Sequence, residues 1–155
     1  MDKFDRYFKG ANKSSYDRLV NTYVDYSTNY SKHYLLTNGY SIVLTDIIRT
    51  DFIENKIISE SIKKHFNGFI DKTNISSIES FDYNYIKNNG VVDNKDHVFK
   101  IANDYCINIP LLNKIKGLIG CNKINVILKN NSDMPIIEVV GKYMQVGYLL
   151  PMRVY

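Results

Sequence analysis

The chain has 155 residues, of which 45% are hydrophobic and 23% are charged, and this length and composition predict a single globular domain. It lacks an apolar run of the roughly 20 residues that a membrane-spanning helix requires, and its first residues lack the apolar core of a signal peptide, so we expect a cytoplasmic protein with no membrane partner. The net charge of +4 is too small for tight DNA binding by one copy. It is compatible with weak contacts made by several copies around one duplex.

The first part of the chain predicts one short helix followed by three strands. Apolar side chains recur there at helical spacing: Phe4, Tyr7, Phe8 and Ala11. Basic side chains lie off that face: Lys3, Arg6, Lys9 and Lys13. Residues 18–26 alternate in a β-rich composition that predicts the first strand. Residues 33–44 hold two apolar runs around Asn38-Gly39, which predicts a hairpin with a type I′ turn.

The middle of the chain is less regular. Residues 53–66 have helical spacing and predict a short helix or an irregular turn. Residues 71–96 mix polar side chains with scattered aromatic ones, so we expect them to form a connecting segment.

The last part of the chain predicts an extended segment, a helix and three more strands. Asn108 has the character of an N-cap, Pro110 suits the first helical turn and Gly120 suits the end of the helix. One helix face is apolar: Leu111, Leu112, Ile115, Leu118 and Ile119. Lys114 and Lys116 lie off this face. Residues 123–130, 135–145 and 146–155 then read as strands.

Each half therefore places a helix with basic residues off its apolar face ahead of three antiparallel strands. This order predicts one α+β domain over residues 1–155, with two short helices on one side of antiparallel sheets and its halves related by a pseudo-twofold axis. The first half covers about 1–48, the connecting segment about 49–97 and the second half about 98–155.

Residue types that carry chemistry are scattered along the chain. The histidines stand in no HExxH or CxxC pattern: His33, His65 and His97. Without a secretion signal, Cys106 and Cys121 are expected to be reduced thiols. The chain has no G-x-S-x-G motif, no glycine-rich phosphate loop and no paired catalytic carboxylates. We therefore expect no metal, no cofactor and no enzymatic activity.

Two segments resemble the bacterial DNA polymerase sliding clamp, a family of ring-forming replication proteins. Residues 34–47, YLLTNGYSIVLTDI, are similar to its "ATDGHRLA" hairpin, whose positions are matched by Thr37, Asn38, Gly39, Tyr40 and Ile42. Residues 98–155 are similar to the closing half of its last domain, with the helix at 109–120 resembling "YLLDALKAL". Within that half, Pro135 to Val139 matches the "P-x-x-I" strand and Leu150 to Val154 matches the terminal "MPMRL" strand.

The chain also departs from the family. Asn38 stands where the motif has Asp, and Tyr40 stands where it has His. Bacterial clamps carry three such domains in one chain, whereas this chain has the length of one. The connecting segment has no clear match in the family.

The resemblance implies a DNA-clamp fold and two sites. A pocket for short peptide motifs of client proteins would be formed by Thr37, Gly39, Tyr40, Ile42, Tyr148, Leu150 and Met152. Residues that face DNA would be Lys3, Arg6, Lys9, Lys13, Lys114 and Lys116. Without the resemblance, ordinary core positions and solvated helix faces would explain the same residues.

The function implied by the resemblance is that of a processivity factor for DNA replication, in a single-domain member encoded by a phage or a mobile element. Its copies would form a homo-oligomeric ring around double-stranded DNA without sequence preference and would bind DNA polymerase or other clamp-motif proteins. In three-domain clamps the two pocket walls belong to successive domains, so we expect head-to-tail copies to rebuild the pocket at a subunit boundary. One alternative is a non-ring protein that mimics a clamp and recruits or inhibits replication proteins. Another is that only the fold is retained and the function lies in the connecting segment.

Overall fold

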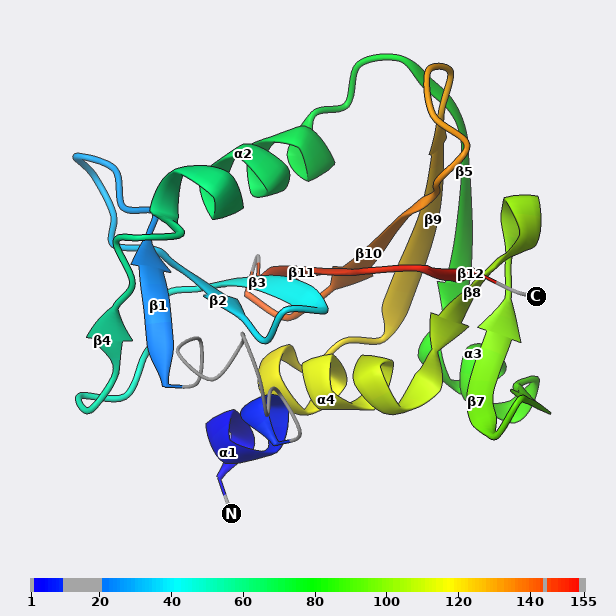
Figure 1. Cartoon of the computed structure of the whole chain (residues 1–155), viewed down its shortest axis with the longest axis horizontal. Helices are drawn as coiled ribbons and strands as arrows, with labels where there is room; N and C mark the ends of the chain where they lie inside the picture. The colour runs from blue at the N-terminus through cyan, green and yellow to red at the C-terminus, as the bar shows by residue number, and fades with distance from the viewer. Residues whose placement is uncertain (1, 10–20, 144, 154–155) are drawn as a thin grey trace.

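The computed structural model describes residues 2–9, 21–143 and 145–153 (Figure 1). The predictions for Ala11, Lys13 and the start of the first strand lie outside these residues, as do those for Val154 and Tyr155.

Eight strands form a large sheet in the order β4-β1-β2-β3-β11-β10-β9-β5. Their bounds are Thr22–Asp25 (β1), Tyr34–Thr37 (β2), Ser41–Thr45 (β3), Ile53–Glu54 (β4), Ile75–Asp82 (β5), Lys123–Lys129 (β9), Ile136–Val140 (β10) and Val146–Leu149 (β11). Neighbouring strands are antiparallel except β1 and β4, which are parallel.

A second, antiparallel sheet of four strands has the order β12-β8-β7-β6. Its strands are Val91–Asp93 (β6), Asp96–Lys100 (β7), Tyr105–Asn108 (β8) and Met152–Arg153 (β12). The helices are Lys3–Phe8 (α1), Ser59–Ile70 (α2), Tyr83–Asn88 (α3) and Ile109–Ile119 (α4), with a 3-10 turn at Ala102–Asp104 (η2). The predicted α+β class is confirmed.

Helix α4 begins and ends as its sequence predicts. The Asn108 side chain accepts a hydrogen bond from the Leu111 amide at 3.0 Å, Pro110 lies in the first turn, and Gly120 ends the helix at φ 67°. Four residues of the predicted apolar face are buried, with Ile115 fully enclosed, and Leu111 is partly buried. The sequence was sufficient to predict where α4 begins and ends, because helix caps depend on residues that are close together in the chain.

The two helix-plus-three-strand segments meet at the centre of the large sheet. Strand β3 pairs with β11 from Ser41, opposite Leu149, to Leu44, opposite Val146. On either side of this junction the order runs β3-β2-β1 and β11-β10-β9. Both segments therefore contribute to one continuous sheet.

Helices cover both faces of this sheet (Figure 1). Leu36 and Val43 pack in the cluster that includes α1 and α4, whereas Leu35 and Ile42 pack with Phe66 of α2. Because neighbouring residues of a strand point to opposite faces, the hairpin contributes to both clusters. The two helices that the sequence predicted, α1 and α4, therefore share one face as expected, whereas α2 lies on the opposite face and α3 is a further short helix.

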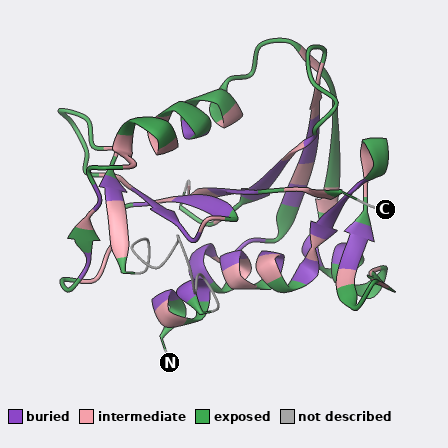
Figure 2. Ribbon diagram, in the orientation of Figure 1, coloured by how far each residue is buried: buried purple, intermediate pink, exposed green. Residues whose placement is uncertain are grey.

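The connecting segment is also more regular than expected. Strand β5 pairs with β9 from Ile75, opposite Lys129, to Asp82, opposite Lys123. Its residues are largely exposed, as the green colour in Figure 2 shows, and only Ile75 and Phe81 are partly buried. An edge strand held mainly by backbone hydrogen bonds needs little apolar alternation, and this explains why the pattern did not indicate it.

The C-terminal segment is not the single strand that was expected. Residues 146–149 form β11 in the large sheet, whereas Met152–Arg153 form β12 in the small sheet. The break falls at Pro151, which has no amide hydrogen to donate. Just before it, the Leu150 amide donates to the Tyr40 carbonyl at 2.8 Å.

Glycine at position 147 lets α4 approach the sheet closely. A Cβ atom there would lie 3.1 Å from Cγ2 of Ile115 and 3.3 Å from Cγ2 of Val43. Both neighbours are enclosed in the core, so they have little room to move.

We expect Ile115→Ala to lower the free energy of unfolding by about 2–5 kcal/mol, because it leaves a cavity between α4 and the sheet. Gly117→Ala is the matched control on the same helix, since a Cβ there meets nothing within 4 Å. This control should be neutral or stabilising by up to about 1 kcal/mol. Urea denaturation measures both, and equal effects of the two changes would contradict the packing described for α4.

Candidate functional site

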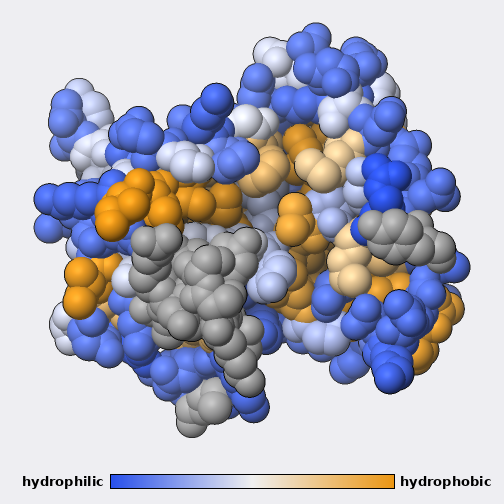
Figure 3. Space-filling view, in the orientation of Figure 1, coloured by the Kyte–Doolittle hydropathy of each residue, from blue (hydrophilic) through white to orange (hydrophobic). Residues whose placement is uncertain are grey.

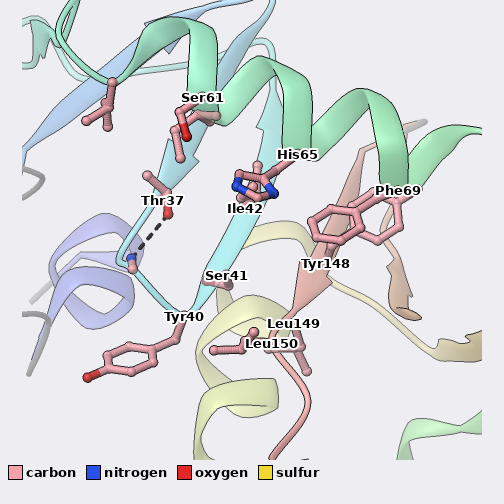
Figure 4. A pocket seen from close by; sticks show the side chains of 13 residues that line it. Thr37, Tyr40, Ser41, Ile42, Ser61, His65, Phe69, Tyr148, Leu149 and Leu150 are labelled. Atoms are coloured by element: carbon pink, nitrogen blue, oxygen red, sulfur yellow. Dashed lines mark hydrogen bonds between the residues drawn. The ribbon is translucent and has the colours of Figure 1, made fainter. Parts of the chain in front are cut away.

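The predicted pocket residues come together in space. Six of the seven line one pocket of about 470 Å³: Thr37, Gly39, Tyr40, Ile42, Tyr148 and Leu150. We call it the central pocket; its walls are residues 37 and 39–42 of the β2–β3 hairpin, residues 148–150, and one face of α2 with its N-cap residue: Ile58, Ser61, Ile62, His65 and Phe69. The view along the pocket shows α2 above and the strands below (Figure 4).

Met152, the seventh residue, lines an adjoining pocket of about 520 Å³. We call it the Arg153 pocket; it is bounded by Tyr40, Lys114, Leu150, Pro151, Met152 and Arg153. Tyr40 and Leu150 line both pockets, so they form the boundary between them. Tyr148, Leu150 and Met152 stand at the alternating positions that would share one face of a continuous strand, but the break at Pro151 places Met152 on β12 and separates it from the other two.

The hairpin wall is shaped by side chains that bond to its own backbone. Thr37 and Ile42 form the last cross-strand pair, so residues 38–41 make the turn. The Asn38 Oδ1 atom accepts from the Tyr40 amide at 3.0 Å and from the Ser41 hydroxyl at 2.9 Å. The Thr37 hydroxyl accepts from the Gly39 amide at 3.1 Å (Figure 4).

The hairpin prediction is confirmed, but its turn type is wrong. Gly39 has a positive φ of 89°, whereas Asn38 does not, and a type I′ turn needs positive φ at both. Asn38 is nearly fully buried, and its Nδ2 atom donates to the Tyr7 carbonyl of α1 at 3.3 Å. This contact with α1 favours a longer turn in which the Asn38 side chain points inward.

Tyr148 forms the buried floor of the central pocket. Its hydroxyl donates to Oε2 of Glu138 at 2.8 Å, and its ring centroid lies 5.2 Å from that of Phe69. Glu138 also accepts from Lys72 Nζ at 2.8 Å and from Asn125 Nδ2 at 3.0 Å. These bonds link β11, β9 and the segment after α2 through one carboxylate.

The pKa values of Glu138 and Tyr148 are set by their burial and by their hydrogen-bond partners. Burial alone would raise the pKa of Glu138, but hydrogen bonds from Lys72, Asn125 and Tyr148 outweigh burial and hold its pKa below the ordinary value. Burial raises the pKa of Tyr148, and the adjacent Glu138 raises it further. Tyr148 therefore stays protonated and remains a hydrogen-bond donor.

Helix α2 supplies a third wall that the sequence analysis did not assign. His65 and Phe69 lie one turn apart, with ring centroids at 6.5 Å, and both face the strands (Figure 4). Phe66, beside them, is buried against Tyr148 at 5.8 Å between ring centroids. The helical spacing of Ile58, Ile62, Phe66 and Phe69 was the available signal, but it does not indicate which surface the helix covers.

Both walls expected from the resemblance belong to one chain. Ile42 of β3 lies directly opposite Tyr148 of β11 in the antiparallel pair. The prediction that a second copy must complete the pocket is therefore wrong, because the sheet itself joins the hairpin to the C-terminal segment.

Of the predicted DNA-facing residues, those that the structure describes belong to α1 with its C-cap residue Lys9 and to α4, and these two helices pack together. Lys3, Arg6 and Lys9 are exposed on α1, whereas Lys114 and Lys116 of α4 are partly buried. Lys114 Nζ donates to the Lys9 carbonyl, and Lys116 Nζ lies 4.0 Å from the centroid of the Tyr83 ring. Burial lowers the pKa of Lys114, and the neighbouring charge of Lys9 lowers it further.

Other chemistry-bearing groups are dispersed over the described ranges. Cys106 and Cys121 are buried free thiols, and burial raises the pKa of Cys121 to about 11. No group of three or more His, Cys, Asp or Glu residues that could hold a metal occurs within residues 2–9, 21–143 and 145–153. In the same part of the chain, none of the helices has the length and apolar character to cross a membrane.

Comparison of the chain with protein-family models, with curated protein sequences and with solved structures finds no match. The resemblance to sliding clamps therefore depends on the two segments quoted above. The geometry adds that these segments are neighbours in one sheet.

The lowered pKa of Glu138 predicts a pH-dependent contribution to stability. This contribution is present above the pKa of an unfolded glutamate, about 4.5, and is lost as pH falls through the lower pKa of the folded state. Glu138→Gln should therefore lower the melting temperature at neutral pH, and its difference from wild type should shrink in acid. Thermal unfolding across pH measures this.

Glu79→Gln, an exposed position on β5, is the control for loss of a carboxylate. It should leave the melting temperature nearly unchanged at neutral pH. A pH-independent difference between Glu138→Gln and wild type would contradict the assigned network.

Proposed function

We propose that this protein is a sliding-clamp-like factor of DNA replication that binds short apolar motifs of DNA polymerase or other client proteins in the central pocket. The observation that carries the proposal is the pairing of the TNGY hairpin with the strand before the LPMRV segment, which joins both resembling segments around one pocket. The order β1-β2-β3-β11-β10-β9 also supports a clamp-like domain with pseudo-twofold related halves.

The central pocket has the size and character of a peptide-binding site. Its volume of about 470 Å³ lies within the range of pockets that hold ligands. Its walls are mostly apolar, and Leu150 at the rim is 51% exposed. Apolar side chains gather on the surface below α2, with hydrophilic residues above them (Figure 3). Burial of a partner's aliphatic or aromatic anchor would therefore drive binding.

A processivity role also requires a ring. A domain of this length has a radius of gyration of about 15 Å and cannot encircle DNA alone. Assembly around a duplex therefore needs several copies.

Two features of the structure support such an assembly. Strand β5 is the last strand of the large sheet in the described part of the chain, so its outer edge can pair with another copy. The exposed cations of α1, Lys3, Arg6 and Lys9, can make loose contacts with phosphates.

A second candidate is a non-ring, clamp-mimicking protein that recruits or inhibits replication proteins. The central pocket favours it, since both walls are present in one chain. The contact of Lys116 with the Tyr83 ring favours it too, because it engages a cation that a DNA-facing surface would use.

Leu150→Asp should weaken binding of a fluorescent clamp-motif peptide by about tenfold or more, because it places a charge in an apolar wall. The side chain is half-exposed, so the fold should survive, and thermal unfolding checks this. Val92→Asp on β6 is the matched control, at a side chain that is 75% exposed and outside the pocket. Equal peptide affinities of the two variants would count against the pocket as the client site.

The ring is tested by molecular mass and by DNA topology. If copies form a ring, light scattering should show a mass that rises with concentration to a closed oligomer. The oligomer should be retained longer on circular than on linear duplex, and its binding should fall steeply with salt. A monomer at every concentration, with intact peptide binding, would favour the non-ring candidate.

A further inference from the structure

Basic residues lie at both ends of the central pocket. At one end, the Arg153 pocket carries Lys114 and Arg153, and none of its described lining residues is acidic. At the other end is a pocket of about 630 Å³ between α2 and the β9–β10 turn. We call it the Lys129 pocket; it is bounded by Glu60, Ser61, Lys64, His65, Phe69 and Lys129.

The three pockets adjoin one another through shared lining residues, and we call them together the groove. Tyr40 and Leu150 line both the central pocket and the Arg153 pocket. Ser61, His65 and Phe69 line both the central pocket and the Lys129 pocket. The central pocket contains no Lys, Arg, Asp or Glu among its described lining residues, so the charge is confined to the two ends.

The cations at the ends keep the capacity to bind a carboxylate. Arg153 donates to the Tyr105 hydroxyl at 2.7 Å, which uses one of five guanidinium N–H groups. Lys114 donates to the Lys9 carbonyl, which uses one of three ammonium hydrogens. Lys64 is exposed and Lys129 is half-exposed, and Glu60 is the one acid among the described residues that line the groove.

We propose that the groove selects peptides in which an apolar core is flanked on both sides by acidic residues. The inference rests on the proposed peptide-binding function and adds the charge of the partner. The core would fill the central pocket, one acidic flank would lie near Lys114 and Arg153, and the other near Lys64 and Lys129. An extended peptide suits this arrangement because its length can cover a groove that one anchor cannot fill.

The test uses three fluorescent peptides with the same short core of aliphatic and aromatic residues, flanked on both sides by Glu, Gln or Lys. We expect the Glu-flanked peptide to bind about fivefold more tightly than the Gln-flanked one, since several exposed ion pairs contribute a few tenths of a kcal/mol each. The Lys-flanked peptide should bind most weakly. The preference should shrink as salt rises, because the pairs are exposed.

Charge reversal at one end assigns the flanks. The double variant Lys64→Glu/Lys129→Glu should abolish the preference for Glu over Gln in the flank that lies at the Lys129 pocket, and should keep this preference in the other flank. Peptides with a single acidic flank, on one side of the core or on the other, measure the two preferences separately. Lys87→Glu/Lys100→Glu is the matched control, because it makes the same charge change at exposed positions on α3 and β7 that do not line the groove. Unchanged melting temperatures verify that both variants are folded.

The outcomes separate this inference from the proposed function. Binding of all three peptides with equal affinity would overturn charge selection and leave peptide binding intact. Failure of all three to bind the folded wild-type protein would overturn both. Displacement of the Glu-flanked peptide by a short DNA duplex would also overturn the inference, because it would assign the basic ends to phosphates.

Discussion

The antiparallel pairing of β3 with β11 is the constraint on which the other features depend. It joins segments that are about a hundred residues apart in the chain, and it places Ile42 directly opposite Tyr148. One face of this pair packs on α4, where Gly147 allows the close approach of Ile115. The opposite face forms the floor of the central pocket. The same backbone hydrogen bonds therefore unite the core and shape the candidate site.

The position of α2 over the pocket depends on a buried polar group. Glu138 binds Lys72, which follows α2, together with Asn125 and Tyr148. A buried carboxylate is tolerated when hydrogen bonds satisfy it, and these bonds also fix the orientation of the Tyr148 ring. Phe66 and Phe69 of α2 then pack against that ring. In this way a segment without clear resemblance to clamps provides a wall of the pocket.

The groove combines an apolar centre with basic ends, and the two parts have different physical roles. Burial of apolar surface supplies most of the affinity of such sites, whereas exposed charges contribute less energy and more discrimination between partners. The folding of both walls within one chain also separates two properties that a three-domain clamp combines. In the proposed function, peptide binding would require one copy of this protein, whereas encirclement of DNA would require several.

The sequence by itself determined the features that depend on local chemistry. Asn108, Pro110 and Gly120 predicted the bounds of α4, Asn38-Gly39 predicted the hairpin, and the quoted segments predicted six residues that line one pocket. Only the tertiary structure decided the turn type, the division of the C-terminal segment between two sheets, and the placement of β5 and α2. These features depend on partners distant in the chain: Asn38 on Tyr7, β5 on β9, and α2 on the ring of Tyr148. Sequence periodicity indicates that a face will be buried, but it does not indicate against which surface, because burial is a property of the assembled fold.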